Sequence, residues 1–112
     1  MRPQREKTDV PQGTLDLLIL KTLSLEPLHG LGVSRRLEQL SRGTFRVNPG
    51  SFFPALYRME QEGWIEGEWR TSENKRRAKF YRLTRAGRRR LDRQQERWRK
   101  TVSVIESVLE SS

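Results

Sequence analysis

The sequence contains no cysteine and only one histidine, His29. The lack of cysteine excludes disulfide bonds, thiolate metal sites and cysteine nucleophiles. A lone histidine without carboxylate or cysteine partners is a poor metal ligand or catalytic base, so we interpret His29 as a loop residue that packs or caps. A glycine-rich loop that could hold a phosphate is also missing. We therefore expect no enzyme activity, no cofactor and no metal.

Long apolar runs are absent too, and hydrophobic residues make up only 33% of the 112 residues. No run approaches the length that crosses a bilayer. The polar tail at residues 1–12 lacks the apolar stretch of a secretory signal. We expect a cytoplasmic protein without membrane contact, whose single small domain has so modest a core that a partner surface helps to complete it.

Acidic residues are few in one strongly basic stretch of the chain, and this uneven distribution of charge indicates a polyanionic binding partner. The whole sequence has 23 Lys and Arg against 14 Asp and Glu, a net charge of +9. Residues 70–100 hold fourteen of the basic and only three of the acidic residues, a local charge of +11. Arginine predominates, which suits contacts with phosphates and guanine edges. We favour nucleic acid over a merely solvated helix face.

The first half of the chain has the apolar spacing of two helices. A leucine-rich segment begins at Gly13 and ends before Pro27, and a second, shorter helix covers residues 31–41. Residues 45–47 alternate and predict a very short strand.

Residues 51–62 predict a third helix that reads DNA. Ser51 is placed as its N-cap, Pro54 falls in its first turn, and Gly63 ends it. The helical spacing predicts an outward face that is small and polar at its start, as close approach to the major groove requires. That face consists of Ser51, Ala55, Arg58 and Glu62.

Two alternating segments, 64–70 and 78–83, predict a β-hairpin whose tip is polar and basic. Such a hairpin directly after a recognition helix is typical of the wing of a winged helix. Its residues are placed to reach phosphates or the adjacent minor groove. The cationic and polar candidates are Ser72, Asn74, Lys75, Arg76 and Arg77. An ordinary surface hairpin is the alternative.

A long helix capped by Thr84 runs towards Glu110 and carries a narrow apolar seam with a polar break at Gln95. A domain this small cannot bury such a stripe alone, so we expect the helix to pair with its copy in a second subunit, together with the first helix. Packing within one chain is the alternative. The predicted interface consists of Leu15, Leu18, Leu91, Trp98, Val102, Ile105 and Leu109.

The ordered segments GTLDLLIL (13–20), LHGLG (28–32), GSFFPALYRME (50–60) with GWI (63–65), and RRAKFYRLTRAG (76–87) resemble the PadR family of transcriptional regulators. The family usually has tyrosine where this chain has Leu31 and Phe53, and the missing hydroxyl at Phe53 puts one phosphate contact in doubt. The single C-terminal helix is similar to the family's shorter branch.

The resemblance implies a mainly α fold with a small β-hairpin, a winged helix-turn-helix at 13–83 and a dimerisation helix at 84–112. It implies a homodimeric repressor that binds a pseudo-palindromic operator in double-stranded DNA. The DNA contacts would come from the recognition helix 51–62 and the wing 71–79. The residues concerned are Asn48, Ser51, Phe53, Pro54, Tyr57, Arg58, Lys75, Arg76, Arg77 and Lys79.

Two questions stay open at this stage. A basic module that binds an acidic protein partner is the second functional hypothesis, because the charge alone fits both. The sequence also identifies no effector. Trp98 on the seam can stack a small aromatic molecule between subunits or serve as plain interface core, and we favour the second.

Overall fold

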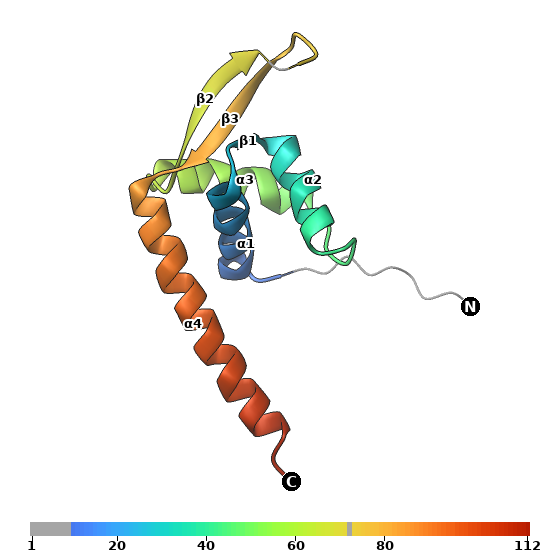
Figure 1. Ribbon diagram of the computed structural model, residues 1–112, viewed down its shortest axis with the longest axis vertical. Helices are drawn as coiled ribbons and strands as arrows, with labels where there is room; N and C mark the ends of the chain where they lie inside the picture. Colours follow the sequence, from blue (N-terminus) through green and yellow to red (C-terminus); the bar gives the residue numbers. More distant parts are fainter. Residues whose placement is uncertain (1–9, 72) are drawn as a thin grey trace, which may run out of the picture.

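The computed structural model describes residues 10–71 and 73–112. Four helices and a three-stranded sheet make up this part of the chain (Figure 1). The mainly α fold with a small β-hairpin is confirmed. The predicted tail, 1–12, lies largely outside the described residues. The elements, in order, are α1 (Gln12–Leu25), β1 (Leu28–His29), α2 (Gly30–Leu40), α3 (Pro49–Gln61), β2 (Ile65–Thr71), β3 (Arg77–Leu83) and α4 (Arg85–Leu109).

The core lies where α1, α2 and α3 meet, and the start of β2 and the first turns of α4 close it. Ile19, Val33, Phe52 and Met59 are wholly buried there. Leu91 of α4 is also buried, with only 2% of its surface exposed. Burial of such side chains is the main stabilising contribution available to so small a domain.

The sheet has the order β1-β3-β2, with both pairings antiparallel. The hairpin β2–β3 is confirmed, and β1 is a third strand that the sequence did not indicate. The short strand expected at 45–47 is wrong. Phe45 and Val47 are half-buried around an exposed Arg46, but no described strand pairs with them. Their alternation reflects packing of the α2–α3 connection against the core.

Side-chain caps fix the starts of three helices. His29 Nδ1 accepts from the Gly32 N–H at 2.9 Å, which confirms its interpretation as a capping residue. Thr84 caps α4, as predicted, by accepting from the Gly87 N–H at 3.0 Å. The N-cap of α3 is Asn48, whose Oδ1 accepts from the Gly50 N–H at 2.9 Å.

The expectation that Ser51 caps α3 is therefore wrong, because the helix begins earlier, at Pro49. Proline at the first helical position loses no intrahelical bond and is well placed there. As a consequence Pro54 lies inside the helix and not in its first turn. The predicted end is right, since Gly63 adopts a φ of +81° just after the last turn.

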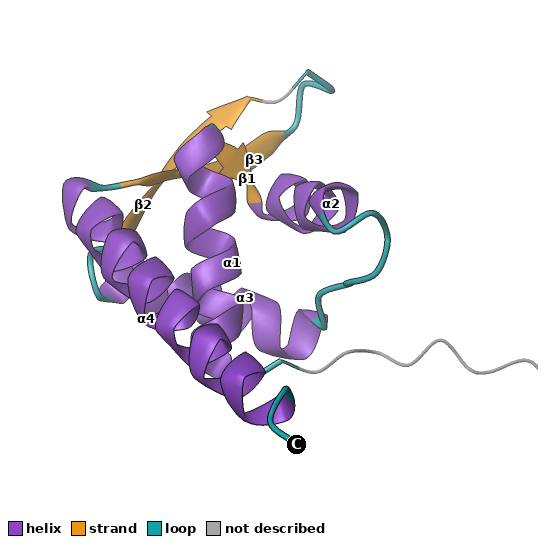
Figure 2. Cartoon of the chain, turned by 60° about the horizontal axis from the view of Figure 1, so that its bottom comes forward, coloured by secondary structure: helices purple, strands orange, loops and turns teal. Residues whose placement is uncertain are grey.

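Helix α4 continues well past the body of the fold, and its C-terminal half stands away from the other elements (Figure 1). Figure 2 shows the same helix with its C-terminal end turned forward. The helix contacts α1 and β3. Thr84 Oγ1 donates to the carbonyl of Gly63 or Trp64, at 2.6 and 3.0 Å. This joint connects the end of α3, the hairpin and α4.

We predict that Gly87→Ala destabilises the protein by about 1–3 kcal/mol, because a Cβ there would collide with the Trp64 carbonyl oxygen and meet Leu83 Cδ1 at 2.7 Å. Urea unfolding at fixed protein concentration measures the change. The control is Arg88→Ala, an exposed neighbour on the same helix, expected within about 0.5 kcal/mol of the parent. Equal stability of both variants would contradict the tight joint.

Candidate nucleic-acid interface and subunit contact

The outward face of α3 is displaced from the predicted one. Ala55, expected to point outward, is buried in the core together with Leu56. Phe53 and Tyr57 are exposed instead, with 52% and 66% of their surface accessible. Because they lie four residues apart, they share one face of the helix. Ser51 and Pro54 are also exposed near its N-terminal end. The exposed face of α3 is thus more aromatic than the helical spacing suggested.

Arg58 does not project freely from α3. Its Nη1 and Nη2 donate to the two carboxylate oxygens of Asp16 on α1, at 3.0 and 2.7 Å. Asp16 is only 3% exposed, and the Arg58 side chain is 32% exposed. The hydrogen bond to Asp16 raises the pKa of Arg58 above its ordinary value. The pair joins α3 to α1.

Sequence reasoning missed Asp16. The available signal was a single acidic residue within a leucine-rich helix, since a carboxylate buried on such a face needs a cationic partner. Its partner lies 42 residues further along the chain, so the local pattern could not identify it.

Lys79, predicted to lie near DNA, also has an intramolecular partner. Its Nζ donates to Glu60 Oε1 of α3 at 2.9 Å and lies 5.6 Å from the centroid of the Tyr81 ring. That hydrogen bond raises the pKa of Lys79, and burial raises the pKa of Tyr81. Lys79 therefore ties β3 to the end of α3.

The tip of the hairpin carries three exposed cations: Lys75, Arg76 and Arg77. Within residues 10–71 and 73–112, none of the three forms an ion pair. The Arg77 guanidinium lies 5.5 Å from the centroid of the exposed Trp69 ring. The tip projects beyond the helices (Figure 1). Ser72 of the predicted wing lies outside the described residues.

The predicted dimer residues divide into two groups. Leu15 and Leu91 are buried within one chain, and Leu18 packs partly against the same core. The remaining four lie further along α4: Trp98, Ile105 and Leu109 are exposed and Val102 is half-buried. Val104 and Val108, which the seam prediction left out, are exposed as well.

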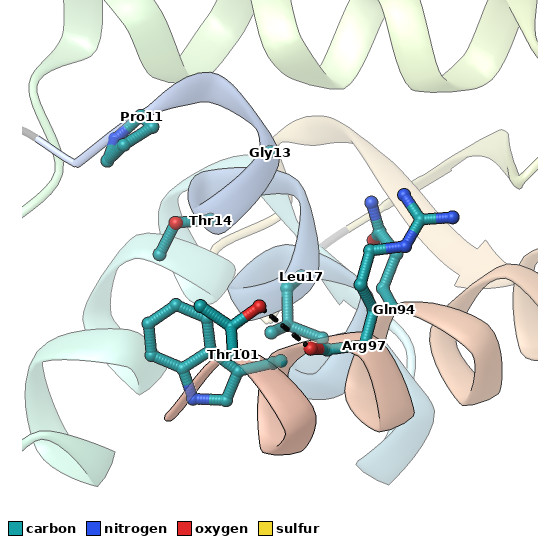
Figure 3. Close-up of a pocket in the computed structure, with 8 residues that line it drawn as sticks. Pro11, Gly13, Thr14, Leu17, Gln94, Arg97 and Thr101 are labelled. Atoms are coloured by element: carbon teal, nitrogen blue, oxygen red, sulfur yellow. Dashed lines mark hydrogen bonds between the residues drawn. The ribbon is translucent and has the colours of Figure 1, made fainter. Parts of the chain in front are cut away.

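A groove of about 270 Å³ lies between the start of α1 and the middle of α4. Pro11 just before α1, Thr14 and Leu17 of α1 and Gln94 of α4 line it (Figure 3). Trp98 of α4 lines it as well. Gln94 Oε1 is buried without a hydrogen-bond donor in the described part of the chain. Such an acceptor normally has a partner.

Residues 10–71 and 73–112 contain no group of three or more His, Cys, Asp or Glu arranged to hold a metal ion. Among the helices described, not one combines the length and the apolar character needed to cross a membrane.

Comparison with known proteins identifies similar regulators. The model of the PadR-like family of transcriptional regulators matches residues 19–93. A transcriptional regulator of Mycobacterium tuberculosis is 36% identical over 72 residues, which are 64% of each chain. The crystal structure of a PadR-like regulator from Bacillus cereus superposes with a TM-score of 0.77 at 30% identity, covering 90% of this chain and 96% of that one. A transcriptional regulator from Clostridium thermocellum superposes with a TM-score of 0.80 at 26% identity, covering 89% and 97%.

We predict that Asp16→Asn lowers the free energy of unfolding by about 1–3 kcal/mol. The substitution keeps the side-chain volume but leaves Arg58 without its charged partner, and the partial exposure of Arg58 limits the cost. Urea unfolding at one protein concentration measures it.

Glu38→Gln is the matched control, because the pair of Glu38 with Arg46, at 3.2 Å, is largely exposed. Its loss should cost less than about 1 kcal/mol. An Asp16→Asn effect no larger than that of the control would show that the buried pair does not hold α3 on α1.

Proposed function

This chain belongs to the PadR-like family of transcriptional regulators, and we propose that it acts as a homodimeric repressor that binds a pseudo-palindromic operator in double-stranded DNA. One observation carries the proposal. The outer face of α3 is largely exposed, and it is followed in the chain by a hairpin tip whose three cations form no ion pair with a described residue. A helix for the major groove and a cationic wing are the two parts that such binding needs.

In this proposal α3 enters the major groove with its N-terminal half. Ser51, Phe53, Pro54 and Tyr57 contact the DNA, and Asn48 holds the start of the helix through its cap. Arg58 has a different role from the one predicted, because its paired Nη groups are directed at Asp16. It positions α3.

The wing supplies affinity without sequence information. Lys75, Arg76 and Arg77 meet phosphates or the adjacent minor groove, releasing counterions as they bind. Lys79 supports the wing from its base through Glu60 and is not itself at the DNA in our proposal.

The subunit contact rests on α4. Trp98, Val102, Ile105 and Leu109 form the seam, and α1 contributes to the same surface. The exposed apolar side chains on a helix that leaves the body of the fold support this, since such a stripe is rarely left in water. Two-fold symmetry would place the two copies of α3 about one helical turn of DNA apart. Each copy would then read the same half-site in opposite orientation, so the operator would be a pseudo-palindrome. The domain boundaries stay as predicted, 13–83 and 84–112.

A small aromatic effector is a secondary proposal. The groove that Trp98 lines offers an indole ring on which a planar ligand can stack. A cytoplasmic location follows from the proposed function, because a repressor must reach its operator.

The rival hypothesis, a basic module for an acidic protein partner, differs in its selectivity. The test is selection of duplexes from a random double-stranded pool, followed by mobility shifts with heparin as competitor. Enrichment of a symmetric sequence supports the repressor. Salt-labile binding to any polyanion with no sequence enriched would favour the rival.

We predict that Ile105→Asp with Leu109→Asp converts the protein to a monomer, because two carboxylates cannot be buried on the seam without partners. Multi-angle light scattering measures the molar mass. The control Arg93→Asp, an exposed position away from the seam, should remain dimeric. A dimer that survives the double substitution would place the contact elsewhere.

We predict that Arg76→Ala with Arg77→Ala weakens binding to all duplexes. The slope of log Kd against log salt should become smaller by about two, because each lost phosphate contact reduces it by about one. Fluorescence anisotropy over a salt series measures both quantities. Arg89→Ala with Arg93→Ala removes the same charge from exposed positions of α4 and should leave the slope nearly unchanged. Equal slopes for the two double variants would contradict the assignment of the wing.

A further inference from the structure

The outer face of α3 has few groups that can hydrogen-bond to bases. Its exposed residues are Pro49, Gly50, Ser51, Phe53, Pro54, Tyr57 and Gln61. Three of these seven have a polar side chain, and Phe53, Pro54 and the ring of Tyr57 make the middle of the face apolar or aromatic. A helix that reads base edges by hydrogen bonds usually presents Arg, Lys, Asn or Gln at its centre.

The only arginine of α3 is not available for guanine. Bidentate recognition of guanine takes two parallel N–H groups, and the Nη1 and Nη2 pair of Arg58 is already directed at Asp16. Lys79, which contacts the end of α3, is held by Glu60. The helix is thus left with an aromatic face and without a free guanidinium.

Phe53 is held in a defined orientation. Its ring packs edge to face on the buried Phe52, with centroids 5.1 Å apart and an interplanar angle of 72°. On the other side it lies against the start of α2, where a Cβ on Gly30 would be only 3.1 Å from Phe53 Cε1. A ring fixed in this way loses little conformational freedom when it meets a ligand.

We propose that Phe53, with Pro54 and Tyr57 beside it, selects thymine through its C5-methyl group. The thymine methyl is the one apolar group that a base pair of ordinary DNA presents in the major groove, and contact with an apolar side chain is how it is read. This inference rests on the proposed function, since it requires α3 to lie in the major groove.

The experiment removes only the methyl group. Duplexes that the protein selects from a random pool are resynthesised with deoxyuridine in place of one thymine at a time, and Kd is measured by fluorescence anisotropy at fixed salt. At the thymine that meets Phe53, we expect replacement in one half-site to raise Kd about fourfold, because one buried methyl group is lost. A duplex with the replacement in both half-sites should have a Kd about 15-fold higher. Thymines outside the α3 contact should show no change.

The variant Phe53→Ala links the effect to the ring. It should bind the thymine and the uracil duplexes with equal Kd, while Leu40→Ala, which also truncates an exposed apolar side chain, should keep the parent's ratio. Phe53→Leu retains an apolar contact and should keep most of the discrimination. Circular dichroism checks that each variant is folded.

Two results would overturn the inference and leave the proposed function intact. One is a selected sequence at which no thymine-to-uracil change alters Kd. The other is a preference for guanine that Arg58→Lys abolishes, which would show that Arg58 leaves Asp16 to read a base. Failure to enrich any sequence would instead contradict the proposed function itself.

Discussion

The ion pair between Asp16 and Arg58 decides what α3 can present to a partner. Asp16 is almost wholly buried in α1, so its charge needs a hydrogen-bonded cation, and Arg58 meets it with two bonds. Together with the apolar core, this contact fixes the rotation of α3 about its axis. With Arg58 turned to α1, Phe52, Ala55 and Met59 fall into the core, and the opposite face carries Phe53 and Tyr57.

Helix α1 contacts both of the helices on which the proposed function depends, α3 and α4. It holds α3 through Asp16 and packs against α4, whose far half carries the exposed apolar seam. The Thr84 hydroxyl adds a second tie, because it bonds to the chain just after α3 and also caps α4. A shift of α4 against its partner in the proposed dimer would therefore reach α3 through packed elements. Such contiguous contacts are what coupling between an effector groove and DNA binding would require.

The sequence predicted elements whose signals are local. Apolar spacing located the helices, alternation located β2 and β3, and Thr84 and Gly63 marked boundaries correctly because capping depends on a few adjacent residues. Ser51 was mistaken for the cap of α3, although Pro49 with Asn48 before it is the pattern of a proline at the first helical position that follows an Asx cap. Strand β1 pairs with residues more than fifty positions away, His29 with Phe80. The partners of Arg58 and Lys79 are likewise distant, which is why both were taken for free cations.

The distribution of charge separates two tasks in the proposed complex. The cations of the hairpin tip act on phosphates, so their contribution falls as salt rises and is the same for every sequence. The ring of Phe53 acts through apolar contact, which salt at physiological strength scarcely changes and which depends on the base. The large positive charge of this chain therefore accounts for attraction to DNA in general. In our proposal selectivity rests on an uncharged patch of α3, because the only arginine of this helix is held by the buried carboxylate of Asp16 on α1.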